Sequence, residues 1–132
     1  MSWSLRWYST GTIVAGTGSM GTGANQLYNP YGLALDSSNS LYIVDRLNHR
    51  VQKYLSGTLT GTTVAGQASG IAGNSAAYLK QPGYLVVDSN NNIYVSDSAN
   101  HRVQYWSNGA TTGITVAGNG KEDARLFLQN IY

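Results

Sequence analysis

The two histidines are the first candidates for catalysis or metal binding in this chain, since imidazole serves both as a general base and as a metal ligand. His49 stands in Asp-Arg-Leu-Asn-His-Arg, and His101 stands 52 positions later in Asp-Ser-Ala-Asn-His-Arg. A catalytic base is needed once, whereas this group occurs twice in the same company. The duplication favours a structural clasp at a turn between strands, held by hydrogen bonds and charge. The clasp residues are Asp45, Asn48, His49 and Arg50 in the first copy and Asp97, Asn100, His101 and Arg102 in the second.

The same residues offer little to catalysis or metal binding. A zinc site would need further convergent ligands, and the chain contains no cysteine to supply thiolates. The repeated carboxylates could hold calcium, but they also fit turn capping, in which they accept from backbone N–H groups. No serine stands in a nucleophile elbow. We therefore predict no catalytic residue, no metal ion and no cofactor. The carboxylates in question are Asp36, Asp45, Asp88 and Asp97.

Gly16, Gly18 and Gly21 match the G-x-G-x-x-G pattern of dinucleotide-binding folds. That pattern requires a following helix, whose N-terminal amides point at the pyrophosphate. Residues 22–29 have neither the apolar periodicity nor the length of a helix. The sequence therefore predicts a glycine-rich loop here, and no nucleotide site.

The elements that must position the clasp form a duplicated unit. Residues 39–54 recur at 91–106 with eight of sixteen positions identical, and Val-Ala-Gly stands at 14–16, 64–66 and 116–118. Each unit divides into four short β runs: 30–36, 41–45, 50–55 and 60–66, then 82–88, 93–97, 102–107 and 112–118. Four strands in a repeat of about fifty residues are typical of a propeller blade.

The composition is that of a turn-rich β protein. Charged residues make up only 11% of the 132 residues, and there are 16 glycines and 10 tyrosines. The net charge of +2 does not by itself indicate a nucleic acid partner. No apolar run approaches the roughly 20 residues of a membrane span, so no membrane association is predicted. The absence of cysteine leaves the cellular compartment unknown.

The run Asn-His-Arg-Val-Gln, at 48–52 and again at 100–104, follows Tyr-Ile-Val-Asp in one unit and Tyr-Val-Ser-Asp in the other, and it resembles the NHL repeat. The resemblance covers residues 7–118 and implies the blades of a β-propeller. The expected fold class is therefore all-β, with β-propeller-type four-stranded antiparallel blades. We expect two full blades at 30–66 and 82–118, a partial blade at 1–16 and a diverged tail at 119–132.

The resemblance implies a non-catalytic binding scaffold for a protein or peptide. The binding surface is expected at the loop before each innermost strand and at the turns 46–47 and 98–99, where the two units differ most. The mixture of tyrosines and basic residues could instead bind single-stranded RNA. A metal-dependent peptide-amidating lyase is also similar to this family and is the third alternative. The candidate binding residues are Tyr28, Tyr31, Arg46, Lys80 and Tyr84.

Two expectations concern packing. The innermost runs 33–35 and 85–87 are apolar at successive positions, which indicates strands covered on both faces by neighbouring blades. Because two blades cannot close a ring, their outer faces would stay bare, and we expect self-association. The other aromatic residues are assigned to the blade core (Tyr42 and Tyr94) or to the contact between blades and the rim (Tyr54, Tyr105 and Trp106).

Overall fold

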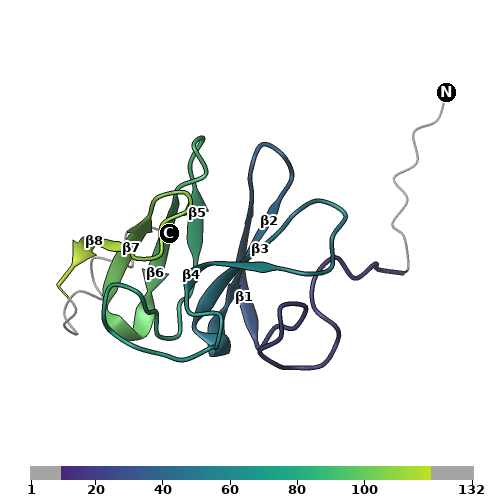
Figure 1. Cartoon of the computed structure of the whole chain (residues 1–132), viewed down its shortest axis with the longest axis horizontal. Helices are drawn as coiled ribbons and strands as arrows, with labels where there is room; N and C mark the ends of the chain where they lie inside the picture. Colours follow the sequence, from purple (N-terminus) through teal and green to yellow (C-terminus); the bar gives the residue numbers. More distant parts are fainter. Residues whose placement is uncertain (1–9, 120–132) are drawn as a thin grey trace, which may run out of the picture.

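The chain forms two four-stranded antiparallel sheets in the computed structural model, which describes residues 10–119 (Figure 1). Blade 1 consists of β1 (Pro30–Leu35), β2 (Leu41–Asp45), β3 (Arg50–Tyr54) and β4 (Thr62–Gly66). Blade 2 consists of β5 (Leu85–Val87), β6 (Ile93–Asp97), β7 (Arg102–Trp106) and β8 (Ile114–Gly118). The strands lie in each sheet in chain order, so each blade is an up-and-down meander. The predicted all-β class with four-stranded antiparallel blades is confirmed.

Short 3-10 helices replace simple turns at two equivalent places. η1 (Arg46–Asn48) joins β2 to β3, and η2 (Ser98–Asn100) joins β6 to β7. The histidine after each is left-handed, with φ of 53° for both His49 and His101. No helix within residues 10–119 is long and apolar enough to cross a membrane.

The strands differ from the predicted ranges mainly at their starts. β4 and β8 begin two residues late, because the N–H groups of Gly61 and Gly113 donate to the carbonyls of Ala24 and Ala76 instead of a neighbouring strand. β5 begins at Leu85 rather than at position 82. The N–H before it, on Tyr84, donates to the Ser96 hydroxyl at 2.8 Å. The partial blade predicted at 1–16 lies mostly outside the described residues, and residues 10–16 contain no strand. The predicted tail at 119–132 lies outside them apart from residue 119.

Each blade has two faces, because side chains alternate along a strand. We call the face of blade 1 that packs against blade 2 its trailing face, and the face of blade 2 that packs against blade 1 its leading face. The same names apply to the equivalent faces on the other side, so the leading face of blade 1 and the trailing face of blade 2 point away from the junction. The trailing face of blade 1 and the leading face of blade 2 pack together into the hydrophobic core, which also includes Leu79 from the loop between β4 and β5. The core residues are Tyr42, Val44, Val51 and Ala65 from blade 1 and Leu85, Ile93, Val95 and Trp106 from blade 2.

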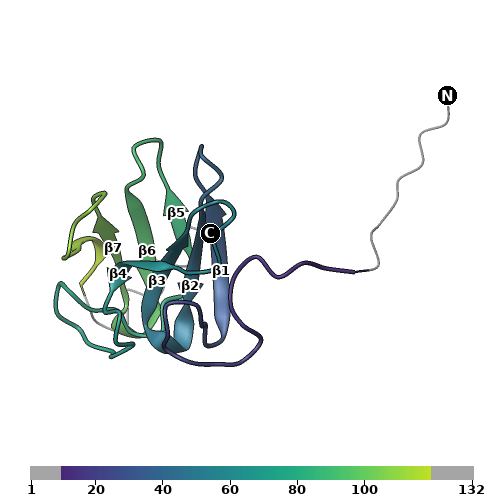
Figure 2. The same cartoon turned by 45° about the vertical axis from the view of Figure 1, so that its right-hand side comes forward.

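The two sheets lie closest along β1 and β5. Gly32 is required there, since a Cβ at this position would lie 2.9 Å from the carbonyl oxygen of Gly83. The β1–β2 and β5–β6 hairpins point the same way (Figure 2). Equivalent loops of the two blades are thus presented at the same end of the molecule.

The opposite faces have no neighbouring blade among the described residues. On the leading face of blade 1, Leu33 is 70% exposed, whereas the equivalent Leu85 in blade 2 is 6% exposed. On the trailing face of blade 2, Tyr94 is 37% exposed, whereas Tyr42 is 2% exposed. The innermost strands β1 and β5 each have one exposed face, at Leu33 and at Val86 (46% exposed), as expected for two blades whose outer faces stay bare. Tyr94 is not a core residue, because burial depends on a neighbouring blade, which within residues 10–119 covers one face of each blade.

The remaining aromatic assignments hold in part. Trp106 lies between the blades, as predicted. Tyr54 is also buried, and its hydroxyl donates to the Ala24 carbonyl at 3.3 Å. Tyr105 lies beside Tyr94 on the trailing face of blade 2, with ring centroids 5.0 Å apart. These two rings form an aromatic pair on a sheet face that blade 1 does not reach.

Candidate functional site

The carboxylate of Asp45 is the centre of the clasp in blade 1. Its Oδ2 accepts from Arg50 Nε at 2.7 Å and from Asn48 Nδ2 at 2.9 Å. Its Oδ1 accepts from the Tyr28 N–H at 2.7 Å. The side chains of Asp45 and Arg50 are 0% and 1% exposed, and such a buried charge is tolerated because an opposite charge and several donors surround it.

The clasp binds main chain rather than a ligand. The Arg50 guanidinium donates to four carbonyl oxygens at 2.8–3.2 Å, three in the loop before β1 and one after β4. Asn48 Nδ2 donates to a further carbonyl of the first loop, that of Gly21, at 2.7 Å. This arrangement fixes the loop before the innermost strand against the η1 turn. The carbonyls bound by Arg50 belong to Thr22, Gly23, Gln26 and Ala68.

Blade 2 repeats this geometry. Asp97 accepts from Arg102 Nε at 2.8 Å, from Asn100 Nδ2 at 2.9 Å and from the Lys80 N–H at 2.7 Å. Burial raises the pKa of Asp97, and the three hydrogen bonds offset part of that rise. Arg102 and Asn100 hold the loop before β5 by its carbonyls at Gly73, Asn74, Ser75 and Tyr78.

The histidines lie outside the clasp. His49 Nδ1 accepts from the N–H of Gln81, in the loop that leads into blade 2, at 2.9 Å. Burial lowers the pKa of His49, and the ammonium of Lys80 lowers it further, so the neutral ring that can accept this bond is favoured. His101 Nδ1 is buried and has no partner among residues 10–119. The imidazole thus joins one blade to the next, and the clasp itself consists of Asp, Asn and Arg.

The candidate binding residues divide into a cluster and two neighbours. Tyr31 and Tyr84 are 54% and 46% exposed, and their rings meet edge to face at 5.6 Å between centroids. The guanidinium of Arg46 lies over the Tyr31 ring, 4.8 Å from its centroid. We call these three residues the Tyr–Tyr–Arg cluster. Tyr28 and Lys80 lie beside it at equivalent positions, where their N–H groups bind the buried carboxylates of the two clasps.

The cluster arises from an exchange between the repeats. Blade 1 reads Pro-Tyr-Gly at 30–32, and blade 2 reads Pro-Gly-Tyr at 82–84. The two tyrosines therefore occupy different repeat positions and meet across the junction. Arg46 has Ser98 as its counterpart, so the cluster occurs once within residues 10–119. Two identical blades would present the same side chains on their loops. Here the Tyr–Tyr–Arg cluster makes the loop surface different from one blade to the next.

Sequence reasoning did not identify the buried glutamines. Gln52 and Gln104 are each 1% exposed, and each amide oxygen accepts from a threonine hydroxyl of the next strand, Thr63 or Thr115. The signal was present, since both pairs are identical at a spacing of 52. The loop carbonyls held by the arginines carry no such signal, because a main-chain acceptor can belong to any residue.

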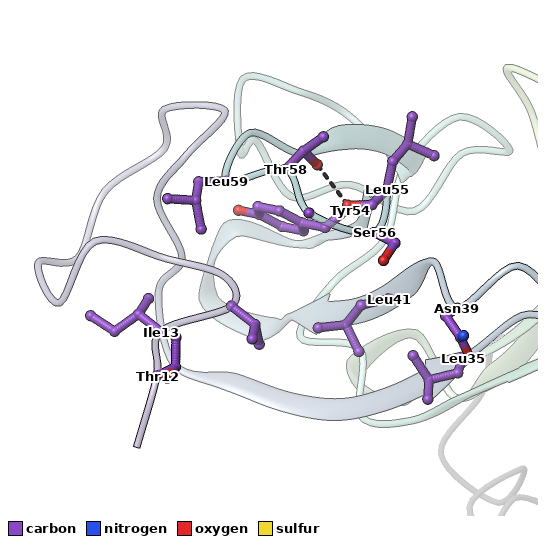
Figure 3. Close-up of a pocket in the computed structure, with 12 residues that line it drawn as sticks. Thr12, Ile13, Leu35, Asn39, Leu41, Tyr54, Leu55, Ser56, Thr58 and Leu59 are labelled. Carbon is purple, nitrogen blue, oxygen red and sulfur yellow. Dashed lines mark hydrogen bonds between the residues drawn. The ribbon is translucent and has the colours of Figure 1, made fainter. Parts of the chain in front are cut away.

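Binding of a metal ion would need a convergent group of side chains within residues 10–119. No three side chains of His, Cys, Asp or Glu gather there as metal ligands would. A cavity of about 560 Å³ opens on the leading face of blade 1 (Figure 3). Its lining is mainly aliphatic and includes Ile13, Leu35, Leu41 and Leu59. Such a lining can bind apolar groups but offers no acid or base.

Comparison with known proteins agrees with the duplicated architecture. The family model described as the NHL repeat matches residues 27–54 and 79–105. The chain is also similar to NHL repeat-containing protein 2 of Bos taurus, with 34% identity over 91 residues. That match covers 64% of this chain and 12% of the relative's length. The residues matched by the family model include both clasps.

Proposed function

Because two segments of this chain belong to the NHL repeat family, we propose that it is a non-catalytic binding scaffold whose loop surface takes a protein or peptide. The proposed surface consists of the Tyr–Tyr–Arg cluster with Tyr28 and Lys80. The observation that carries the proposal is the cluster itself, which places two exposed rings and a half-buried arginine side by side. Tyrosine and arginine are the residues that most often supply the binding energy of protein interfaces.

The clasps support this role by holding the surface rigid. The N–H groups of Tyr28 and Lys80 are each fixed by a buried carboxylate, and the carbonyls of the same two residues accept from Leu47 and Ala99. The loops that carry the cluster are thereby held before any partner arrives. A surface that is already ordered loses less conformational entropy on binding.

The charges indicate which peptides would bind. Arg46 and Lys80 are the cationic residues of the surface, while Asp45 and Asp97 below it are buried and paired. The outward charge is therefore positive. A segment with an aromatic or aliphatic side chain next to a carboxylate has the complementary chemistry.

Single-stranded RNA has less support on the same surface. Base stacking needs an open ring face, and Arg46 already lies over one face of Tyr31 while Tyr84 packs edge to face against it. A net charge of +2 gives little electrostatic attraction for a polyanion. The lyase alternative would need a base and metal ligands that converge, and His49 and His101 stand on separate blades.

Selection from a displayed random-peptide library tests the proposal. Peptides selected on the wild-type chain should bind the double variant Tyr31→Ser/Tyr84→Ser at least ~30-fold more weakly, the effect of losing about 2 kcal/mol of anchor energy. Tyr94→Ser is the matched control, because Tyr94 is a similarly exposed tyrosine on the trailing face of blade 2.

A uridine oligonucleotide provides the competing arm of the experiment. Binding of the oligonucleotide that weakens steeply with added salt, together with no selectable peptide, would replace the proposal by the RNA alternative. Selected peptides that bind the double variant as tightly as the wild type would show that the cluster is not the binding surface.

A further inference from the structure

The hydrogen bond that joins the two blades has an acceptor and a donor whose equivalents on the outer faces are unpaired within residues 10–119. Inside the chain, His49 Nδ1 in blade 1 accepts from the Gln81 N–H of blade 2. In blade 2, the equivalent His101 Nδ1 is buried without a partner among residues 10–119. In blade 1, the position equivalent to Gln81 is Asn29, which has the same left-handed conformation, with φ of 54° against 46°. No hydrogen bond engages the Asn29 N–H within the same residues. Within residues 10–119, an acceptor and a donor of the right kind thus lack partners on opposite faces.

A hollow at the junction of the blades has a counterpart on the open face of blade 1. At the junction, a cavity of about 260 Å³ is lined by blade 2 at 91, 93 and 106–111 and by blade 1 at 42, 53 and 62–64. The open cavity of about 560 Å³ is lined at 39, 41 and 54–59, each 52 positions before the blade 2 wall. Residues 12–14 stand opposite, where the second wall would be (Figure 3). The open cavity is therefore the junction cavity without its neighbouring sheet.

The side chains at this outer end differ between the junction and the open faces. Four positions that are polar at the junction are apolar on the open faces. Both open faces are uncharged at these positions, so each could bury them against the other without stranding a charge. The junction residues are Lys53, Thr62, Ser107 and Thr111, and their open-face equivalents are Tyr105, Ile114, Leu55 and Leu59.

We propose that the trailing face of blade 2 binds the leading face of blade 1 in a second copy of this chain. His101 Nδ1 then accepts from the Asn29 N–H of that copy, and Tyr105 and Ile114 close the cavity beside Leu55 and Leu59. The contact repeats, between chains, the packing that blade 1 and blade 2 make within one chain. It is heterologous, with unlike faces meeting, so it generates a ring if the rotation closes and an open array if it does not.

The contact requires two adjustments. Residues 12–14 occupy the place that β8 of the second copy would take, and they are displaceable, since they form no strand and Ile13 and Val14 are 62% and 63% exposed. At the inner edge, Tyr84 would stand where Gly32 stands at the internal junction. A Cβ is too close to the opposite strand there, so β5 and the second copy's β1 lie further apart than β5 and β1 do within one chain.

Light scattering of the full chain with two charge variants tests the proposal. Ile114→Glu blocks the trailing face, and Leu59→Glu blocks the leading face. Both side chains are largely exposed, at 64% and 58%, so neither change disturbs the fold of the single chain. Ile71→Glu is the control, because Ile71 is 60% exposed in the loop between β4 and β5, outside both faces.

The wild type and the control should show the mass of two or more chains, and each face variant the mass of one. An equal mixture of the two face variants should form a dimer and stop there, because each retains one intact face. In the associated form, exchange of the Asn29 amide hydrogen should slow at least tenfold. A monomeric wild type, face variants that still associate, or a mixture that stays monomeric would each overturn the proposal.

Discussion

Blade 1 and blade 2 contain the same clasp, yet their arginines are buried to different extents. Arg50 is 1% exposed and binds carbonyls before β1 and also the Ala68 carbonyl beyond β4. Arg102 is 9% exposed and binds the equivalent carbonyls in the loop before β5, while the position equivalent to Ala68 lies outside the described residues. Blade 1 is thus tied to the segment that leads to its neighbour. The comparison teaches that a repeat unit supplies the clasp, while the packing around that unit sets how deeply the clasp is buried.

The largest expected effect comes from removing one arginine at a time. Arg50→Met should lower the free energy of unfolding by about 3–5 kcal/mol, because Asp45 would keep a buried charge without its cation. Arg102→Met is the matched control and should cost less, since Arg102 is more exposed. Urea unfolding followed by circular dichroism measures both. Equal losses would mean that the two clasps are energetically alike.

An intermediate effect is expected at the histidines, since within residues 10–119 the Nδ1 atom of His49 has a hydrogen-bond partner and that of His101 has none. His49→Asn should cost about 0.5–1.5 kcal/mol through the lost bond from Gln81, and asparagine tolerates the left-handed backbone. His101→Asn should cost less, because its Nδ1 has no partner among the described residues. Chemical denaturation at neutral pH compares them. A larger loss for His101→Asn would contradict the difference between the blades.

The pH dependence sharpens the same comparison. The pKa of His49 is lowered by burial and by Lys80, against smaller opposite effects of Asp97 and Asp45, so the folded state binds fewer protons than the unfolded state. The stability from His49 is therefore complete above the ordinary histidine pKa of about 6.5 and declines as the pH falls through the lowered value. His49→Asn should flatten the fall in stability between about pH 7 and 5, measured by denaturation at several pH values. An unchanged slope would show that His49 does not titrate on unfolding.

The smallest effect is expected at an ion pair that only blade 1 has. Lys53 Nζ lies 3.4 Å from Asp36 Oδ2 and 5.0 Å from the Tyr42 ring centroid, whereas blade 2 has Tyr105 at the Lys53 position. Lys53→Met should cost below about 1 kcal/mol, because the ammonium is partly solvated. The loss should shrink in high salt, as urea unfolding with and without added sodium chloride would show. A salt-independent loss would point to packing instead of charge.

Much of the clasp could be predicted from duplication alone. The repeat at a spacing of 52 predicted the strands. It also predicted that Asp45 pairs with Arg50, because the two residues lie opposite each other in one hairpin. It did not give the partner of His49, since the bond reaches Gln81 in the next blade, 32 positions away. Local pattern indicates contacts within a unit and says little about contacts between units.

Burial was the least predictable property. Tyr42 and Tyr94 are identical residues at the same repeat position, and one is core while the other is surface. The exchange of Tyr and Gly between 30–32 and 82–84 was visible, but its consequence was not. Only the junction shows that Tyr31 and Tyr84 meet.

By itself, the sequence determined two copies of a four-stranded sheet, the turns that join their strands and the charged residues that hold those turns. These features depend on neighbours along the chain, so alternation, turn residues and a repeated motif suffice to specify them. The tertiary structure alone decided which face of each sheet is covered, where the imidazoles bind and which tyrosines touch. Those outcomes depend on the packing of one sheet against another, and identical residues differ there because, within residues 10–119, one face of each sheet has a neighbouring sheet and the other has none.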